Sequence, residues 1–123
     1  MLKKPDTLSE HHITVQKSAR FYTIGTTGMN IRRVWIVCHG YSQLAGQFIR
    51  YFGVLDDGAN YVVAPEGLNL FYLNRFAAER DTARKVGATW MTREDRLTAI
   101  DDYISFLSNV HDRIFDDLRR KDV

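Results

Sequence analysis

Hydrophobic residues recur along this chain with a spacing that predicts one long amphipathic helix near its carboxyl end. Apolar side chains stand three or four positions apart at Leu97, Ile100, Tyr103, Ile104, Leu107, Val110, Ile114 and Leu118. This periodicity places them on one helical face and predicts a helix over residues 94–118. Thr92, followed by Glu94 and Asp95, predicts an N-terminal cap with acidic residues in the first turn.

Two unbroken apolar runs predict buried parallel strands. Residues 33–38 end in Val-Trp-Ile-Val-Cys without alternation, as in a strand that is buried on both faces of a sheet. Residues 61–64 form a second run, closed by Pro-Glu-Gly at 65–67. The intervening residues 43–54 predict a helix, so the three segments should form a right-handed parallel strand–helix–strand unit.

The remaining segments have weaker patterns. Residues 1–10 are a polar lead-in, and residues 11–123 are expected to form a single α/β domain. Apolar residues alternate over 12–17, and a short connection to 19–25 predicts an antiparallel hairpin. Residues 66–90 predict a long irregular segment, whose aromatic side chains favour a functional loop over disorder.

Composition narrows the classes of protein. The 123 residues include 17 basic and 15 acidic side chains, a net charge of +2, and the two signs are interspersed. Such a mixture is typical of a solvated surface and argues against a nucleic-acid partner. The single cysteine, Cys38, cannot form an internal disulfide, which favours a reducing, cytoplasmic location. No apolar run suggests a signal peptide or a membrane span.

The candidate chemistry lies where the first apolar run ends, at His39-Gly40-Tyr41-Ser42-Gln43. A strand, a tight glycine turn and a helix leave backbone N–H groups unpaired at the carboxyl end of the sheet. Ligands of α/β proteins bind at that edge. We therefore expect Gly40, Ser42 and Gln43 to lie against a substrate.

Three motifs in this order resemble the α/β-hydrolases, and more narrowly the phospholipase/carboxylesterase branch, which includes acyl-thioesterase-like enzymes. They are His-Gly-Tyr at 39–41, Ala-Pro-Glu-Gly at 64–67 and Gly-Ala-Thr-Trp at 87–90. The resemblance covers roughly residues 12–123. It implies a three-layer fold with an amino-terminal antiparallel hairpin followed by parallel strands and crossover helices. In that family a strand bearing Gly-x-Ser-x-Gly comes next, so the chain is similar to the amino-terminal half of such an enzyme.

The resemblance also implies roles for individual residues. The backbone N–H of Tyr41 would donate to the oxyanion of a tetrahedral intermediate, with a second donor following the absent serine. Tyr72, Trp90 and Met91 would line an acyl or alcohol pocket; the alternative is that they are core residues beneath a long loop. No metal and no cofactor is implied.

Ser42 is a weak substitute for the missing nucleophile. It follows the third predicted strand, whereas the family's serine follows the fifth, and Leu44 stands where the second glycine of the motif belongs. The sequence favours a turn hydroxyl that caps the following helix. His39 and Glu66 are interpreted as structural, hydrogen-bonding residues at strand ends.

Two functions follow from these patterns. The first is the amino-terminal portion of a serine hydrolase acting on small esters, thioesters or lysophospholipid-like acyl groups, with its triad outside these residues. The alternative is a non-catalytic, hydrolase-derived binding or assembly module. In either case residues 33–38 would form an uncovered sheet edge, which predicts self-association or a homodimer through that strand.

Overall fold

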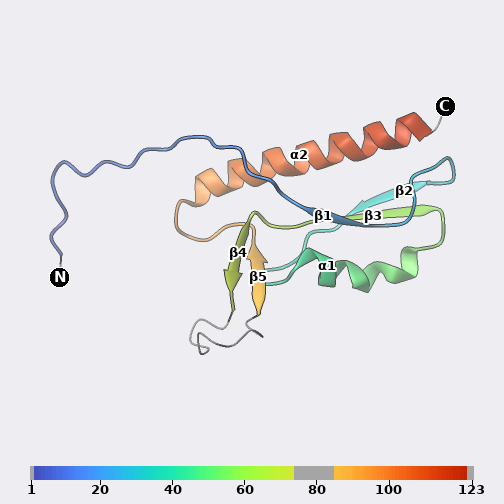
Figure 1. Cartoon of the computed structure of the whole chain (residues 1–123), viewed down its shortest axis with the longest axis horizontal. Helices are drawn as coiled ribbons and strands as arrows, with labels where there is room; N and C mark the ends of the chain where they lie inside the picture. The colour runs from blue at the N-terminus through green and yellow to red at the C-terminus, as the bar shows by residue number, and fades with distance from the viewer. Residues whose placement is uncertain (1, 74–84, 122–123) are drawn as a thin grey trace.

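The computed structural model describes residues 2–73 and 85–121, which form a mixed α/β structure with two small sheets (Figure 1). Its elements in chain order are β1 (Phe21–Ile24), β2 (Arg33–Ile36), α1 (Ala45–Phe48), the 3₁₀ helix η1 (Ile49–Leu55), β3 (Asn60–Pro65), β4 (Asn69–Tyr72), β5 (Val86–Thr89) and α2 (Arg96–Lys121).

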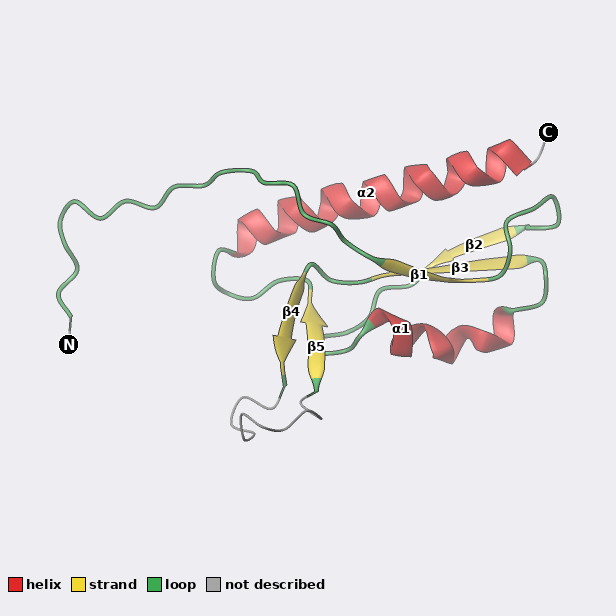
Figure 2. Ribbon diagram, viewed as in Figure 1, coloured by secondary structure: helices red, strands yellow, loops and turns green. Residues whose placement is uncertain are grey.

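The larger sheet is built around β3, with the strand order β1-β3-β2 (Figure 2). β2 pairs with β3 in parallel, from Arg33 opposite Asn60 to Ile36 opposite Val63. β1 pairs with the other edge of β3 and runs antiparallel to it. The predicted parallel strand–helix–strand unit is therefore confirmed.

Alternating side chains of β3 form two hydrophobic cores, one on each face of the sheet. On one face Val62 and Ala64 pack against Ala45 and Ile49 of the short helices. On the other face Tyr61 and Val63 pack against α2. Figure 1 shows the sheet between α2 and α1, so these elements form three layers.

Within this sheet β3 is the strand buried on both faces, and β2 is an edge. All six residues of β3 are buried, whereas Trp35 and Ile36 of β2 are 42% and 38% exposed. The expectation that residues 33–38 are buried on both faces is thus wrong: Arg33, Trp35, Ile36 and Cys38 are exposed, and Val34 and Val37 are only partly buried. The physical reason is that a strand at the sheet edge has a neighbour on one side only.

The predicted hairpin of 12–17 with 19–25 is also wrong. Residues 12–17 are extended and unpaired, and Ile13 is 88% exposed. The following strand forms as β1, but its partner is the free edge of β3. Alternating hydrophobicity indicates an extended segment, but it does not identify the strand with which that segment pairs.

The segment predicted to be irregular contains a second sheet. β4 and β5 pair antiparallel, from Asn69 opposite Thr89 to Tyr72 opposite Val86. Residues 74–84 of the same predicted segment lie outside the described residues. Gly87 allows the close approach of β5 to the turn after β2, because a Cβ there would lie 2.4 Å from the carbonyl oxygen of Ser42.

Both predicted helices form, with shifted boundaries. The first starts at Ala45 and becomes a 3₁₀ helix at Ile49. Gly46 within it lies against the ring of Tyr22, where a Cβ would be 3.0 Å from Cζ. The second starts at Arg96, so Glu94 and Asp95 precede the helix instead of occupying its first turn. Thr92 accepts a hydrogen bond from the Glu94 N–H (3.2 Å) and stabilises the turn before the helix.

Truncating the α2 side of the core tests the packing of the layers. Ile114 is 2% exposed within this core. We expect Ile114→Ala to lower the free energy of unfolding by about 2–5 kcal/mol, because the substitution leaves a cavity. Ile104 on the same helix is 53% exposed, so Ile104→Ala should cost about 0.5 kcal/mol or less. Urea denaturation measures both; equal losses would contradict the packing described here.

The outer edge of β2 generates a second prediction. The N–H of Val37 donates to Val63 (2.9 Å) and that of Arg33 to Ala59 (3.2 Å), so the backbone groups of Val34 and Ile36 face outward. We expect Ile36→Lys to reduce self-association, because a charged edge side chain opposes strand pairing. Sedimentation velocity over a concentration series measures this, with Ile104→Lys as the control. Wild-type protein that stays monomeric throughout the series would contradict the expectation.

Candidate functional site

The turn that joins β2 to α1 is held by its own backbone and by β5. Among residues 40–43, the N–H of Gly40 donates to Gln43 Oε1 (2.6 Å) and that of Gln43 to Gly40 O (3.2 Å). The N–H of Ser42 donates to Ala88 O (2.9 Å), and the Ala88 N–H returns a bond to Gln43 O (3.1 Å). The N–H of Tyr41 has no hydrogen-bond partner among the residues that the structure describes. It is the free donor of this turn.

His39 connects this turn to the ends of β3 and β5. Its side chain is buried, and Nε2 accepts a hydrogen bond from the Gly67 N–H (2.9 Å). Nδ1 must then carry the proton, which it donates to Gly40 O (2.8 Å). Trp90 stacks on the imidazole at 5.0 Å and donates its indole N–H to His39 O (2.9 Å). Both ring nitrogens are occupied, as the structural interpretation of His39 requires.

Glu66 anchors the other side of the turn. Its carboxylate is 3% exposed and accepts two hydrogen bonds from Arg20, from Nε at 2.5 Å and from Nη2 at 3.2 Å. It also accepts the N–H of Ala45 (3.2 Å), at the start of α1. The hydrogen bond to Glu66 raises the pKa of Arg20 above its ordinary value. Glu66 therefore holds the start of α1 against the end of β3.

Ser42 occupies a strained position but has no base beside it. Its φ is +69°, in the left-handed region that favours glycine. None of the histidines in the described part of the chain hydrogen-bonds to its hydroxyl. The expected capping role is wrong: α1 begins after Leu44 without a side-chain cap, and the Ala45 N–H is bound by Glu66 instead.

A cavity of about 480 Å³ opens beside the turn, between β4, β5 and the start of α2. Its lining residues are Lys17, Tyr41, Leu68, Asn69, Phe71, Thr89, Trp90, Thr92, Glu94, Asp95, Thr98, Ala99 and Asp102. Tyr41 and Phe71 are in ring contact at 5.4 Å. One wall of the cavity is thus aromatic, and the wall near α2 is polar and acidic.

The structure places two of the expected site residues in this cavity: Tyr41, the expected oxyanion donor, and Trp90, one of the residues expected to bind substrate. Gly40, Ser42 and Gln43 form the supporting turn and are outside its lining. Tyr72 borders a separate apolar depression of about 300 Å³, shared with Leu70, Phe71 and Val86.

Met91 is also outside the cavity lining, and its backbone carbonyl accepts a hydrogen bond from Thr89 Oγ1 (2.7 Å). Phe71, Glu94 and Asp102 line the cavity although the motifs did not indicate them. The only features of the sequence that pointed toward them were the aromatic residues of the segment after β3 and the acidic residues near the start of the predicted helix. The pairing of β4 with β5 brings Phe71 to Tyr41.

Electrostatics make the α2 side of the cavity negative. Glu94, Asp95 and Asp102 contribute three carboxylates to the lining, against the single ammonium of Lys17. The Thr98 hydroxyl donates to Asp95 Oδ1 (2.9 Å), and His12 lies within 3.1 Å of the same carboxylate. These hydrogen bonds hold the pKa of Asp95 below its ordinary value, with Thr98 the larger cause. Asp95 is therefore ionised at neutral pH.

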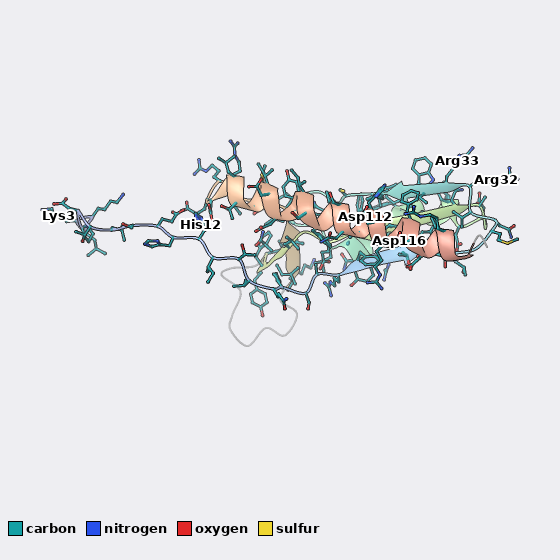
Figure 3. The ribbon with its side chains drawn as sticks, turned by 90° about the horizontal axis from the view of Figure 1, so that it is seen from above. Lys3, His12, Arg32, Arg33, Asp112 and Asp116 are labelled. Atoms are coloured by element: carbon teal, nitrogen blue, oxygen red, sulfur yellow. The ribbon has the colours of Figure 1, made fainter. Side chains whose placement is uncertain are left out.

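His12 also brings Asp95 close to a second carboxylate. Its Nε2 lies 3.0 Å from Asp95 Oδ2 and 3.1 Å from Glu10 Oε2, and the three ligand atoms lie within 4.8 Å of one another. Figure 3 shows His12 on the extended amino-terminal segment, at the opposite end of the molecule from Arg32 and Arg33. All three residues are exposed, and hydrogen-bonded ion pairs account for their arrangement without a metal ion. No local pattern indicates this cluster, because Asp95 is 83 positions from His12.

Comparisons of this chain with protein-family models, curated proteins and solved structures return no match. No described helix combines the length and apolar character that crossing a membrane requires. The turn, its two anchors and the cavity are therefore the features that indicate a function.

Replacing the buried histidine tests whether it is structural. His39→Phe keeps an aromatic ring beside Trp90 but leaves the Gly67 N–H without its acceptor. We expect a loss of about 1–3 kcal/mol in the free energy of unfolding, because a buried donor becomes unsatisfied. His111 is exposed on α2, so His111→Phe should change stability by no more than about 0.5 kcal/mol. Chemical denaturation compares the two; an unchanged His39→Phe protein would contradict the anchoring role.

Proposed function

We propose that this chain is the amino-terminal portion of an α/β-hydrolase of the carboxylesterase, lysophospholipase or acyl-thioesterase type, and that it supplies half of the oxyanion-binding site. The single observation that carries the proposal is the free N–H of Tyr41. It belongs to a residue that lines the cavity, while the N–H groups at positions 40, 42 and 43 are all bound.

A fixed, unpaired N–H suits the chemistry of acyl transfer. Negative charge develops on the carbonyl oxygen when a nucleophile attacks an ester or thioester, and a preorganised donor stabilises that charge without reorganising. The Tyr41 donor is preorganised because His39 and Gln43 hold Gly40, and Ala88 holds Ser42. The role uses the backbone, so it is compatible with tyrosine at this position.

The nucleophile, its base and its acid come from residues outside this chain in this proposal. No histidine among the described residues hydrogen-bonds to Ser42, and His39 uses both nitrogens structurally. The open edge of β2 would accept a further strand, as the parallel sheet of a three-layer hydrolase requires. The alternative function, a binding module without chemistry, is favoured by the same absence of a base at Ser42. Both functions use the cavity beside Tyr41.

An active-site probe and a proline substitution test the proposal together. We expect a fluorophosphonate to leave the 123-residue chain unlabelled, and to label the longer polypeptide that contains it together with a nucleophilic serine. In that polypeptide Tyr41→Pro removes the N–H donor and should lower kcat by roughly 10²–10³. Tyr41→Ala is the matched control, because it removes the ring but keeps the donor.

Three results would contradict the proposal. Labelling of the short chain at Ser42 would place the nucleophile in this turn. Full turnover by a folded Tyr41→Pro variant would remove the oxyanion role. An unlabelled longer polypeptide would favour the binding module.

A further inference from the structure

We infer that the cavity beside Tyr41 binds a small organic cation of the alkylammonium class. The inference follows from aromatic rings and carboxylates that line the same space of about 480 Å³. Neither the oxyanion donor nor the family resemblance requires this arrangement. The arrangement therefore indicates a class of ligand that the proposed acyl-transfer chemistry does not define.

The aromatic wall offers open ring faces. Tyr41 is 68% exposed, and its ring contacts Phe71 at 5.4 Å with an interplanar angle of 34°. Trp90 adds apolar surface, but His39 covers one of its faces by stacking. Tyr41, with its largely exposed side chain, is therefore the ring most available to a ligand, and Phe71 supports it from one side. The faces of such rings attract cations, and most strongly when the cation is partly removed from water.

Carboxylates on α2 and in the turn before it supply the negative charge of the cavity lining. Asp102 lies one helical turn beyond Thr98 on α2, and both residues line the cavity. Glu94 and Asp95 come from the turn that precedes the helix. Three carboxylates outnumber the ammonium of Lys17, and a negative charge remains even when a protonated His12 beside Asp95 and the roughly half positive charge at a helix N-terminus are counted. A ligand group whose only charge is negative would be repelled by this part of the lining.

An alkylammonium group fits both walls at once. Its methyl or methylene surface can lie against the rings, and its delocalised positive charge can face the carboxylates. A hydrated metal ion would gain little from the aromatic wall, because its water shell separates it from the rings, and a neutral alkyl group would gain nothing from the acids. Assigning the cation to part of an ester substrate rests on the function proposed above, but cation binding itself does not.

An isosteric pair of ligands provides the test. Choline and 3,3-dimethylbutan-1-ol have nearly the same shape and differ by one positive charge. The chain has two tryptophans, so the indole N–H of Trp90 reports on the cavity and that of Trp35 is the internal reference, assigned with Trp35→Phe. In an NMR titration at low ionic strength we expect a saturable shift of the Trp90 signal, with a Kd for choline about tenfold lower than for the alcohol.

Neighbouring acids on α2 provide the matched control. Asp102 lines the cavity and Asp101 does not, although both are exposed. Asp102→Asn should raise the Kd for choline about fivefold, and Asp101→Asn should change it less than about twofold.

Equal affinity for choline and the alcohol, no saturable shift, parallel shifts of both indoles, or equal effects of the two variants would each overturn the inference. The two proposals fail separately. Choline binding with full turnover by Tyr41→Pro would remove only the oxyanion role. Loss of turnover without choline binding would remove only the cation site.

Discussion

The carboxyl end of β3 holds the candidate site together. The two residues after this strand bind opposite sides of the turn that follows β2: the Gly67 N–H donates to His39, and the Glu66 carboxylate accepts the first N–H of α1. β3 is the most deeply buried strand of the sheet, so these anchors are attached to the most rigid part of the molecule. A free N–H can be preorganised only if the groups around it cannot move, and these two contacts provide that restraint.

Hydrophobic periodicity and turn residues predicted the elements whose formation depends on nearby residues in the sequence. The apolar stripe of α2, the parallel pairing of β2 with β3 and the glycine turn after β2 follow from periodicity and turn chemistry. The apolar pattern alone did not distinguish the central strand from the edge, because the residues of β2 are as apolar as those of β3. The edge position of residues 33–38 was expected from the family resemblance, and the strand order agrees with it. Alternation over 12–17 likewise indicated an extended segment, but it did not show that the expected partner strand pairs with β3 instead.

The site was predictable in part. The His-Gly-Tyr motif indicated the turn, because backbone geometry after a strand is a local property, and the resemblance to the α/β-hydrolases implied that Tyr41 is its donor. Phe71 and Asp102 could not be identified in that way, because they line the same cavity only in the folded chain. Their positions depend on the pairing of β4 with β5 and on the packing of α2 against the sheet. Glu66 was correctly interpreted as structural, but its bond to Ala45 spans 21 positions and displaced the capping role expected for Ser42.

Two glycines have a consequence for how the cavity can change shape. A Cβ at Gly67 would lie 2.8 Å from the carbonyl group of Thr89, and one at Gly87 would lie 2.4 Å from the Ser42 oxygen. Backbone therefore touches backbone at both places, with no side chain between that could rotate. The hairpin bearing Phe71 and the turn bearing Tyr41 must move as one body. Any widening of the cavity to admit a larger molecule has to come from α2 and the residues leading into it.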